Sequence, residues 1–483
     1  MKTQTKNSIY KFKKLGILCF AVLAVTSCKK TFDINVDPNN PADVPIKTLL
    51  PAAQVDLAYT LGGEGTRIPA TVVQYYAGHR GQPLNYAQYN IQSADLDYLW
   101  TNMYSGVLKD LRAIIDKGTA SGDLVDAGAA QVLTAYSFSV LTDIFGDIPY
   151  TQALGGINSL TPAYDKQEAI YPSLIALIDQ GIANLKSGKG GAEPLAGDLI
   201  YKGNVSRWEK FGNSLKLRLY NHLSKVQPAA AQTFLNSNPS LIVANTENAA
   251  VAFGSVASNA NPKYQFDVLS GRLDNAMAST LVDRMKALND PRIDVYFNPI
   301  ENNTNGKQGQ IIGNVPGVDD DDSGLSKFSR EGSAYASSES PVVLISAAEV
   351  QFITAEVQLR AGNNALAQTA YNSAIDRDFE FLGVGSSAAY KAQATVAFNN
   401  TIERLISQKW ITMEQAPFES WVDYRRTGFP VLTVPTPNRT SGVVPRRLPY
   451  PQVEINLNRQ SLTAGPGVPV PFEALKQKVW WDK

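Results

Sequence analysis

Cysteine and histidine are nearly absent from this chain of 483 residues. It contains two cysteines, Cys19 and Cys28, and two histidines, His79 and His222. The sequence holds neither a His-Glu-x-x-His nor a Gly-x-Ser-x-Gly motif, which argues against zinc hydrolysis and serine nucleophiles. His222 follows a helical pattern and is predicted to be structural. His79 lies in a glycine-rich segment, where it could touch a ligand.

An excess of charge of either sign is also missing. The chain has 44 basic and 44 acidic residues. An amino-terminal leader with five lysines and no acid accounts for part of the basic charge, and without it 39 basic residues face 44 acidic ones. A mildly acidic chain is not suited to nucleic acid or to anionic membrane surfaces. Beyond the leader, no apolar run approaches the ~20 residues of a membrane-spanning helix.

The leader has the pattern of an export signal. Lysines precede a short apolar run from Leu15 to Val25, and small residues follow it. Val25-Thr26-Ser27-Cys28 resembles the lipobox of bacterial lipoproteins, in which the cysteine thiol receives a diacylglyceryl group and the leader is removed. We therefore expect Cys28 to be acylated. The alternative is an ordinary secretory signal with an incidental cysteine. With Cys19 removed and Cys28 acylated, no intramolecular disulfide is expected.

Apolar residues in the body of the chain recur at helical spacing. One strong amphipathic face runs from Trp100 to Ile115, and a second pattern covers residues 123–144. Ser206 is expected to cap a further helix that carries Trp208. Strands are scarce, with one short candidate at residues 249–253. The pattern predicts an all-α fold of helical hairpins with long irregular loops and little β structure.

One pair of helices has a repeat-like spacing of small residues. Ala355, Gly362, Ala367, Tyr371 and Ala374 stand at the intervals of the second half of a tetratricopeptide repeat. Small side chains at these places let two antiparallel helices approach closely. The first half of the repeat fits less well, because the Trp-Leu-Gly start is missing.

Aromatic residues in irregular segments are the candidates for ligand binding. Segments 236–272 and 296–341 exceed the usual length of a connection, and such loops are often functional. A flat ring on a loop can stack on the apolar face of a sugar, while polar neighbours bond its hydroxyls. The alternative is that these rings only pin the loops onto the body. The candidates are Tyr75, Tyr76, Tyr86, Tyr89, Tyr264 and Phe266.

An acidic run, Asp319 to Asp322, invites a calcium interpretation. Asp319, Asp321 and Ser323 with Gly324 partly match an EF-hand loop, but the closing acid is one place late, at Glu331. A solvated acidic loop is the better interpretation. Asp319 and Asp321 are therefore weak metal candidates, and no cofactor is predicted.

Nine short blocks in order along the chain together resemble a known family. They are Asp37-Pro38-Asn39, Leu49-Leu50-Pro51, Trp100 with Tyr104, Phe145-Gly146-Asp147-Ile148-Pro149-Tyr150, Trp208 to Arg218, Leu288-Asn289-Asp290-Pro291-Arg292, Gln408-Lys409-Trp410, Trp421 to Gly428 and Arg446-Arg447-Leu448-Pro449-Tyr450-Pro451. Behind a lipobox, this order is similar to the SusD/RagB family of nutrient-binding outer-membrane lipoproteins, and more closely to its SusD-like 2 branch.

The resemblance implies a fold, a location and a partner. It implies tetratricopeptide-like helical pairs, no catalysis, and a lid over a SusC-type TonB-dependent barrel that imports oligosaccharides or peptides. We expect a signal peptide at 1–27, a flexible tether at 28–45 and a single SusD-like domain at 46–483. The protein is expected on the outer membrane, lipid-anchored and surface-exposed. Lys29-Lys30 depart from the pattern of surface lipoproteins of these bacteria, which often carry acids at these positions.

Alternatives remain within this interpretation. The mildly acidic mature chain favours a neutral oligosaccharide, while a peptide is the second choice. A glycoside hydrolase is a rival because 44 acids always offer carboxylate pairs, and a purely structural helical scaffold is another. Arg425 and Arg426 are predicted to be structural, by pairing with Asp423 or by capping the carbonyl groups of their helix.

Overall fold

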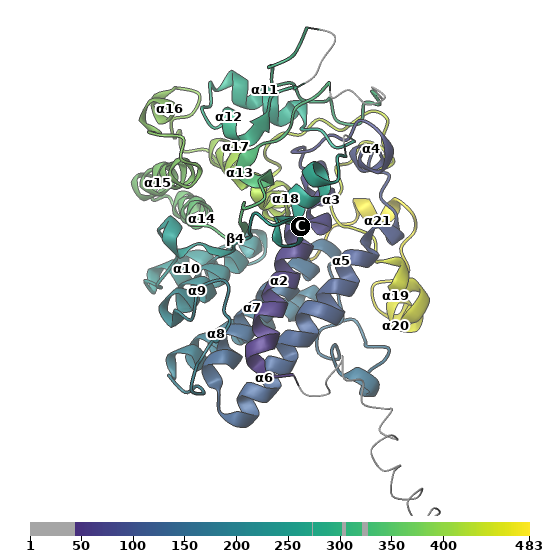
Figure 1. Ribbon diagram of the computed structural model, residues 1–483, viewed down its shortest axis with the longest axis vertical. Helices are drawn as coiled ribbons and strands as arrows, with labels where there is room; N and C mark the ends of the chain where they lie inside the picture. The colour runs from purple at the N-terminus through teal and green to yellow at the C-terminus, as the bar shows by residue number, and fades with distance from the viewer. Residues whose placement is uncertain (1–43, 273, 302–305, 321–326) are drawn as a thin grey trace, which may run out of the picture. The chain divides into compact units, whose positions relative to one another are not determined.

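A computed structural model describes residues 44–272, 274–301, 306–320 and 327–483. Residues Ile46–Lys483 form one compact unit, drawn in Figure 1. The export leader, the lipobox cysteine Cys28, nearly all of the tether and Asp321 lie outside the described residues. The expectations that concern them remain predictions.

Helices make up most of the described chain. In the first half they are α2 (Ile46–Gly62), α3 (Glu64–Val72), α4 (Gly81–Ala87), α5 (Asp97–Thr101), α6 (Lys109–Ser121), α7 (Leu124–Phe145), α8 (Gln167–Lys186), α9 (Val205–His222) and α10 (Ala230–Asn236). In the second half they are α11 (Ser279–Ala287), α12 (Ile293–Tyr296), α13 (Ser333–Ala336), α14 (Ala347–Arg360), α15 (Asn364–Leu382), α16 (Ala388–Ala392), α17 (Ile402–Thr412), α18 (Pro417–Thr427), α19 (Gln452–Leu457), α20 (Arg459–Ala464) and α21 (Glu473–Lys476).

The described strands form two small antiparallel sheets. In one sheet β1 (Ala249–Val251) pairs with β4 (Val342–Ile345), and in the other β2 (Phe297–Asn298) pairs with β3 (Arg330–Glu331). The predicted all-α fold with little β structure is confirmed.

The central helix is α7, which packs against α6 and α8 (Figure 1). A β-carbon at Gly128 would lie 2.6 Å from the carbonyl oxygen of Gly181, so only glycine lets α7 and α8 approach this closely. Among the described residues α7 is the one helix long and apolar enough to cross a membrane, but 94% of its most apolar window is buried in the protein. It is therefore a core helix.

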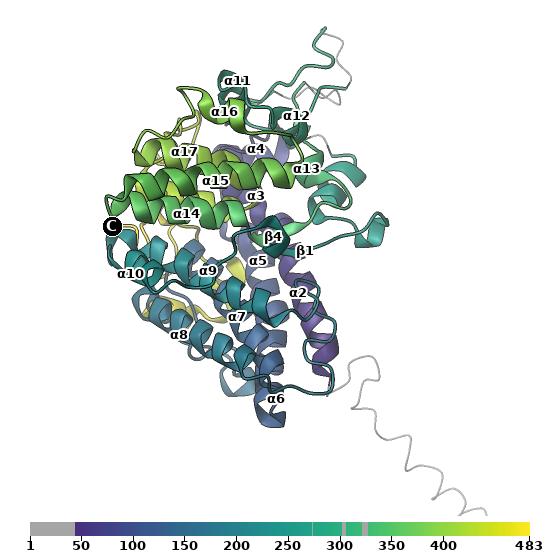
Figure 2. The ribbon, with the colours of Figure 1, turned by 90° about the vertical axis from the view of Figure 1, so that its left-hand side faces the viewer.

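Helices α14 and α15 form the pair with repeat-like spacing (Figure 2). Ala355, Ala367 and Ala374 are fully buried between or beside them. Gly362, with φ +80°, lies in the turn that joins the two helices. The small residues act as predicted, because they remove the bulk that would hold the two helix axes apart.

Two local predictions are wrong. The amphipathic face from Trp100 to Ile115 is not one α-helix, since a π-helical turn, η2 (Asn102–Leu108), separates α5 from α6. Ser206 is not a cap, because α9 begins one residue before it. Asn204 has the extended backbone of a cap residue, and its side chain accepts the N–H of Arg207 at 3.1 Å.

Buried ionic pairs join helices that are distant in sequence. Arg218 of α9 lies 2.6 Å from Glu349 of α14, and His222 of α9 lies 2.9 Å from Glu419 of α18. All four side chains are almost completely buried. Removing one member of such a pair leaves an uncompensated charge in the core, so these contacts fix how the helices dock.

Arg425 and Arg426 are buried, as a structural role requires. Arg426 pairs with Asp423, as predicted. Arg425 instead donates to the backbone oxygens of Asp143 at 2.6 Å and Arg446 at 3.1 Å, and lies 4.0 Å from the ring centre of Trp421. Both guanidinium groups hold α18 to other parts of the fold.

Candidate functional site

Four of the predicted ligand-binding tyrosines are buried. The exposed fractions of Tyr75, Tyr76, Tyr86 and Tyr89 are 0%, 2%, 5% and 1%. Rings enclosed by protein cannot stack on a sugar, so burial corrects the prediction for these four side chains. The segment that carries them has no periodicity from which burial could be read.

Three of these four tyrosines use their hydroxyl groups inside the protein. Tyr75 donates to the backbone oxygen of Trp410, and the two rings stack with centres 5.3 Å apart. Tyr76 donates to Glu331 at 2.9 Å, and Tyr86 donates to Asp95 at 3.2 Å. These tyrosines pin segment 62–94 onto the body, which is the alternative that the sequence left open.

His79 is also buried, with an exposed fraction of 2%. Its Nδ1 atom lies 3.0 Å from the backbone oxygen of Asp320. It therefore ties the glycine-rich segment to the long 296–341 loop, and its burial leaves little surface for a ligand. His222 has the predicted structural role, since it lies between Asp143 and Glu419.

Tyr264 and Phe266 remain partly accessible, on the π-helical turn η7 (Tyr264–Leu269). The Phe266 ring is covered by arginine, because the guanidinium carbon of Arg67 lies 3.0 Å and that of Arg272 lies 4.4 Å from its centre. A guanidinium is attracted to the negative face of a ring. Phe266 therefore fixes two hydrogen-bond donors and leaves little of its own face for a ligand.

Tyr98 is an exposed aromatic side chain on α5, the helix that packs against α3, which carries Arg67. It is 39% exposed. Burial and the carboxylate of Glu64 raise the pKa of its hydroxyl, while Arg67 opposes the shift. We call Arg67, Tyr98, Phe266 and Arg272 the aromatic–cation cluster.

Acids compensate the arginines of the aromatic–cation cluster. Arg272 is paired with Asp274. Asp267 is buried, and this burial together with Glu331 raises its pKa to about 6, although Arg67 and neighbouring cations oppose the shift. The cluster thus presents oriented N–H donors without a large net positive charge. Such a surface suits a ligand with hydroxyl groups better than a polyanion.

A surface groove of about 690 Å³ lies between α5, η2 and α19. Its lining includes Trp100, Tyr104, Leu154, Glu454 and Leu457. Tyr104 donates to the backbone oxygen of Pro149 at 2.7 Å, and Trp100 is only 4% exposed. The aromatic side chains there mainly support the wall of the groove.

The weak metal candidates gain no support. Asp319 is exposed, and the adjacent Asp320 pairs with Lys327 at 2.7 Å. Within the described ranges, no group of three acidic, histidine or cysteine side chains is arranged to hold a metal ion. Asp321 lies outside those ranges.

Arg67, Tyr98 and Arg272 were missed from the sequence. A signal existed for Tyr98, since it precedes the inward Trp100 by two positions and therefore falls on another flank of the helix. No signal existed for the arginines. Arg67 and Phe266 are far apart in sequence, and only the packing of η7 against α3 brings them together.

Comparison with known proteins gives a consistent result over most of the chain. A family model described as "SusD-like_2: Starch-binding associating with outer membrane" matches residues 38–451. A search of curated proteins found no match. Many solved structures are similar to this chain.

A chitin-binding SusD homologue from Flavobacterium johnsoniae has 26% identity and a TM-score of 0.77, with 91% of this chain and 98% of that chain covered. A SusD homologue from Bacteroides uniformis has 26% identity and a TM-score of 0.77, with 90% and 99% covered. A SusD/RagB family protein from Bacteroides thetaiotaomicron has 24% identity and a TM-score of 0.78, with 91% and 99% covered, and shares the fold.

Proposed function

The chain belongs to the SusD-like 2 family, and from that membership we propose that it captures a nutrient oligosaccharide at the outer membrane as the lid of a SusC-type TonB-dependent transporter. The family is one of binding proteins without catalytic activity. The proposed anchor is the acylated Cys28, followed by a tether to residue 45 and a single domain at 46–483. A peptide is the alternative ligand in the same import system.

The observation that carries the ligand proposal is the aromatic–cation cluster. Tyr98 offers an accessible ring on α5, which packs against α3, and Phe266 holds Arg67 of α3 together with Arg272. A pyranose ring presents an apolar face edged by hydroxyl groups, which such a surface can stack on and bond at the same time. Tyr264, half-buried on the same turn, is a further candidate contact.

The charge balance supports a neutral ligand. Asp267 and Asp274 lie close to the arginines and reduce their net field. The similar chitin-binding protein of Flavobacterium johnsoniae makes N-acetylglucosamine oligomers the first probe, and the family description makes starch fragments the second.

The isolated protein is expected to bind weakly. One stacked ring adds only about 1 kcal/mol beyond the area that it buries. The remaining enclosure of the ligand would then come from the transporter beneath the lid. Pull-down from detergent-solubilised outer membranes should recover a large barrel protein, and recovery of the protein alone would count against the partnership.

Calorimetry with chitohexaose, maltohexaose and a mixed peptide pool tests the ligand class. We expect binding of a neutral oligosaccharide that Tyr98→Ala weakens about fivefold, which corresponds to the loss of one stacked ring. Tyr220→Ala, on α9 outside the cluster, is the matched control and should leave binding unchanged. Binding of peptides alone would contradict the proposal of an oligosaccharide ligand. Unchanged oligosaccharide affinity in Tyr98→Ala would contradict the proposed location of the site.

A further inference from the structure

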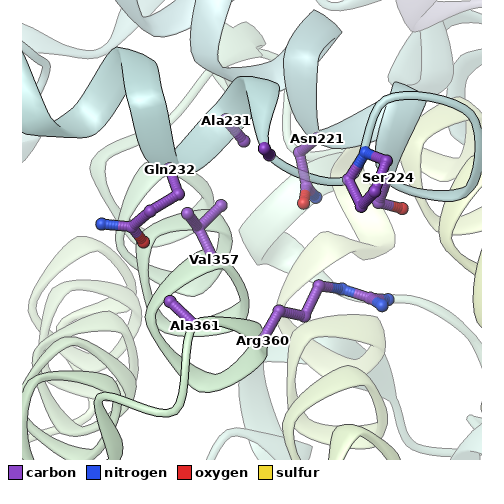
Figure 3. A pocket seen from close by; sticks show the side chains of 9 residues that line it. Asn221, Ser224, Ala231, Gln232, Val357, Arg360 and Ala361 are labelled. Carbon is purple, nitrogen blue, oxygen red and sulfur yellow. The ribbon is translucent and has the colours of Figure 1, made fainter.

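A separate cavity of about 510 Å³ lies between the carboxyl ends of α9 and α14, at the start of α10 (Figure 3). None of its lining residues belongs to the aromatic–cation cluster. In Figure 3, Asn221 reaches the cavity from one side and Arg360 from the other. The lining consists of Asn221, Ser224, Pro228, Ala229, Ala231, Gln232, Val357, Arg360 and Ala361.

Arg360 gives the cavity an exposed cation. Its Nε atom lies 2.9 Å from Glu356, and the Arg360 side chain is 36% exposed. Glu356 is already engaged by both terminal nitrogens of the buried Arg426. The carboxylate is thus shared, and within the described residues no other acid pairs with Arg360.

Within the described residues Arg360 shares its one carboxylate with a buried arginine. Arg426, which holds the same Glu356, also pairs with Asp423, and Asp423 in turn holds Lys409 at 2.8 Å. Burial opposes ionisation of Glu356, but Arg426 and then Arg360 and Lys409 lower its pKa below the ordinary value, so it is already ionised. An additional anion beside Arg360 would give this partly exposed guanidinium a second charged partner.

Ser224 and Asn221 supply neutral hydrogen-bonding groups next to Arg360. The Ser224 hydroxyl accepts from Arg426 at 2.9 Å, and its hydrogen finds no acceptor among the described residues. Asn221 is 1% exposed and donates through Nδ2 to Glu356 at 3.1 Å. Its Oδ1 atom is buried without a donor in the described part of the chain, and so is Oε1 of Gln232. Buried acceptors without a partner favour a ligand that brings N–H groups.

The rest of the lining is apolar and shallow. Pro228, Ala231, Val357 and Ala361 leave room for a small side chain. A ligand that fits these features has a carboxylate, an adjacent N–H group and a small apolar substituent. A free amino acid fits less well, because its ammonium group would lie close to the guanidinium of Arg360 and be repelled by it.

We propose that this cavity binds the free carboxyl end of a peptide. The carboxylate accepts hydrogen bonds from Arg360 and Ser224, the last peptide N–H donates to Oδ1 of Asn221, and a small last side chain lies against Val357. This site is independent of the oligosaccharide proposed for the aromatic–cation cluster, so each can fail without the other.

Calorimetry with N-acetyl-Ala-Ala and its carboxy-terminal amide tests the proposal. We expect the acid to bind, and the amide to bind at least about tenfold more weakly, since a hydrogen bond to a charged group is lost. Arg360→Gln should weaken binding of N-acetyl-Ala-Ala by the same factor as replacement of its carboxylate by the amide. Arg377→Gln removes a cation that pairs with Glu380 on α15, outside the cavity, and should have no effect.

Free alanine and N-acetylneuraminic acid are the competing probes. Both carry a carboxylate, but free alanine is a zwitterion, and N-acetylneuraminic acid is a sugar whose acetamido group lies on a different ring carbon from the carboxylate. Tighter binding of either than of N-acetyl-Ala-Ala would overturn the assignment. So would equal binding of acid and amide, full binding by a folded Arg360→Gln variant, or no detectable binding of the acid at millimolar concentration.

Discussion

Arg426 meets Glu356 at two points, with Nη1 at 2.7 Å from Oε1 and Nη2 at 2.9 Å from Oε2. Neither side chain is exposed. The pair joins α18, near the end of the domain, to α14 of the helical pair with repeat-like spacing. Its planar, two-pronged geometry fixes the register between the two helices, which a single apolar contact would not do.

Arg426→Ala is expected to lower the free energy of unfolding by about 3–5 kcal/mol, because it removes the buried guanidinium that holds Glu356 at two points, while Asp423 keeps Lys409. Urea denaturation measures this loss. Arg360→Ala is the matched control, since Arg360 contacts the same carboxylate from a partly exposed position and should cost at most about 1 kcal/mol. Similar losses in the two variants would contradict the assigned role of burial.

Stability should fall as the pH rises through about 9, because of His222. Burial disfavours its charge, but Glu419 and Asp143 prevail and raise its pKa from 6.5 to about 9. The folded protein holds a proton that the unfolded chain releases. The stabilisation is complete below pH 6.5, amounts to about 3 kcal/mol, and is lost as pH rises through the folded pKa.

Urea unfolding at pH 6, 7.5 and 9 tests this pH dependence. His222→Gln should be less stable than the native protein at pH 6, with the difference shrinking toward pH 9. Titration of the histidine ring protons by NMR reports the pKa directly. A difference between the two proteins that stays constant over this pH range would contradict the ionised state assigned to His222.

Tyr75→Ala and Tyr98→Ala should separate stability from binding. Tyr75 is fully buried against Trp410, so its loss leaves a cavity that costs about 3–5 kcal/mol, as for other large aromatic side chains. Tyr98 is 39% exposed, and its replacement should change stability by no more than about 0.5 kcal/mol. The test measures the thermal stability of each variant and its affinity for the oligosaccharide. Tyr75→Ala should mainly lower stability, and Tyr98→Ala should mainly lower affinity. Equal stability losses would place Tyr98 in the core.

Cys28→Ala should release the protein from the membrane. The sequence predicts that acyl chains on Cys28 hold it there, each buried methylene contributing about 0.8 kcal/mol. Phase separation in detergent and incorporation of labelled fatty acid measure the attachment. Ser27→Ala keeps the cysteine and serves as the control. Labelled fatty acid in the Cys28→Ala variant would contradict the lipobox interpretation.

The helical part of the fold could be predicted because its information is local. Apolar spacing predicted α7, and small residues predicted the close approach of α14 to α15. Each signal lies within one helix or one helix pair, where geometry repeats every 3.6 residues. The π-helical turn between Trp100 and Ile115 could not be predicted from the sequence, because apolar spacing alone does not distinguish an α-helical turn from a π-helical turn.

The candidate site could not be predicted in the same way, because it is formed by contacts between segments that are distant in the sequence. In segment 62–94 no period relates one side chain to the next, so the sequence could not tell that the Tyr75 ring is buried against Trp410. The order of family blocks along the chain was enough to predict the family and its fold. Which aromatic ring remains accessible, and which arginine lies beside it, was decided by how distant segments pack, since burial is a property of the surroundings and not of the residue.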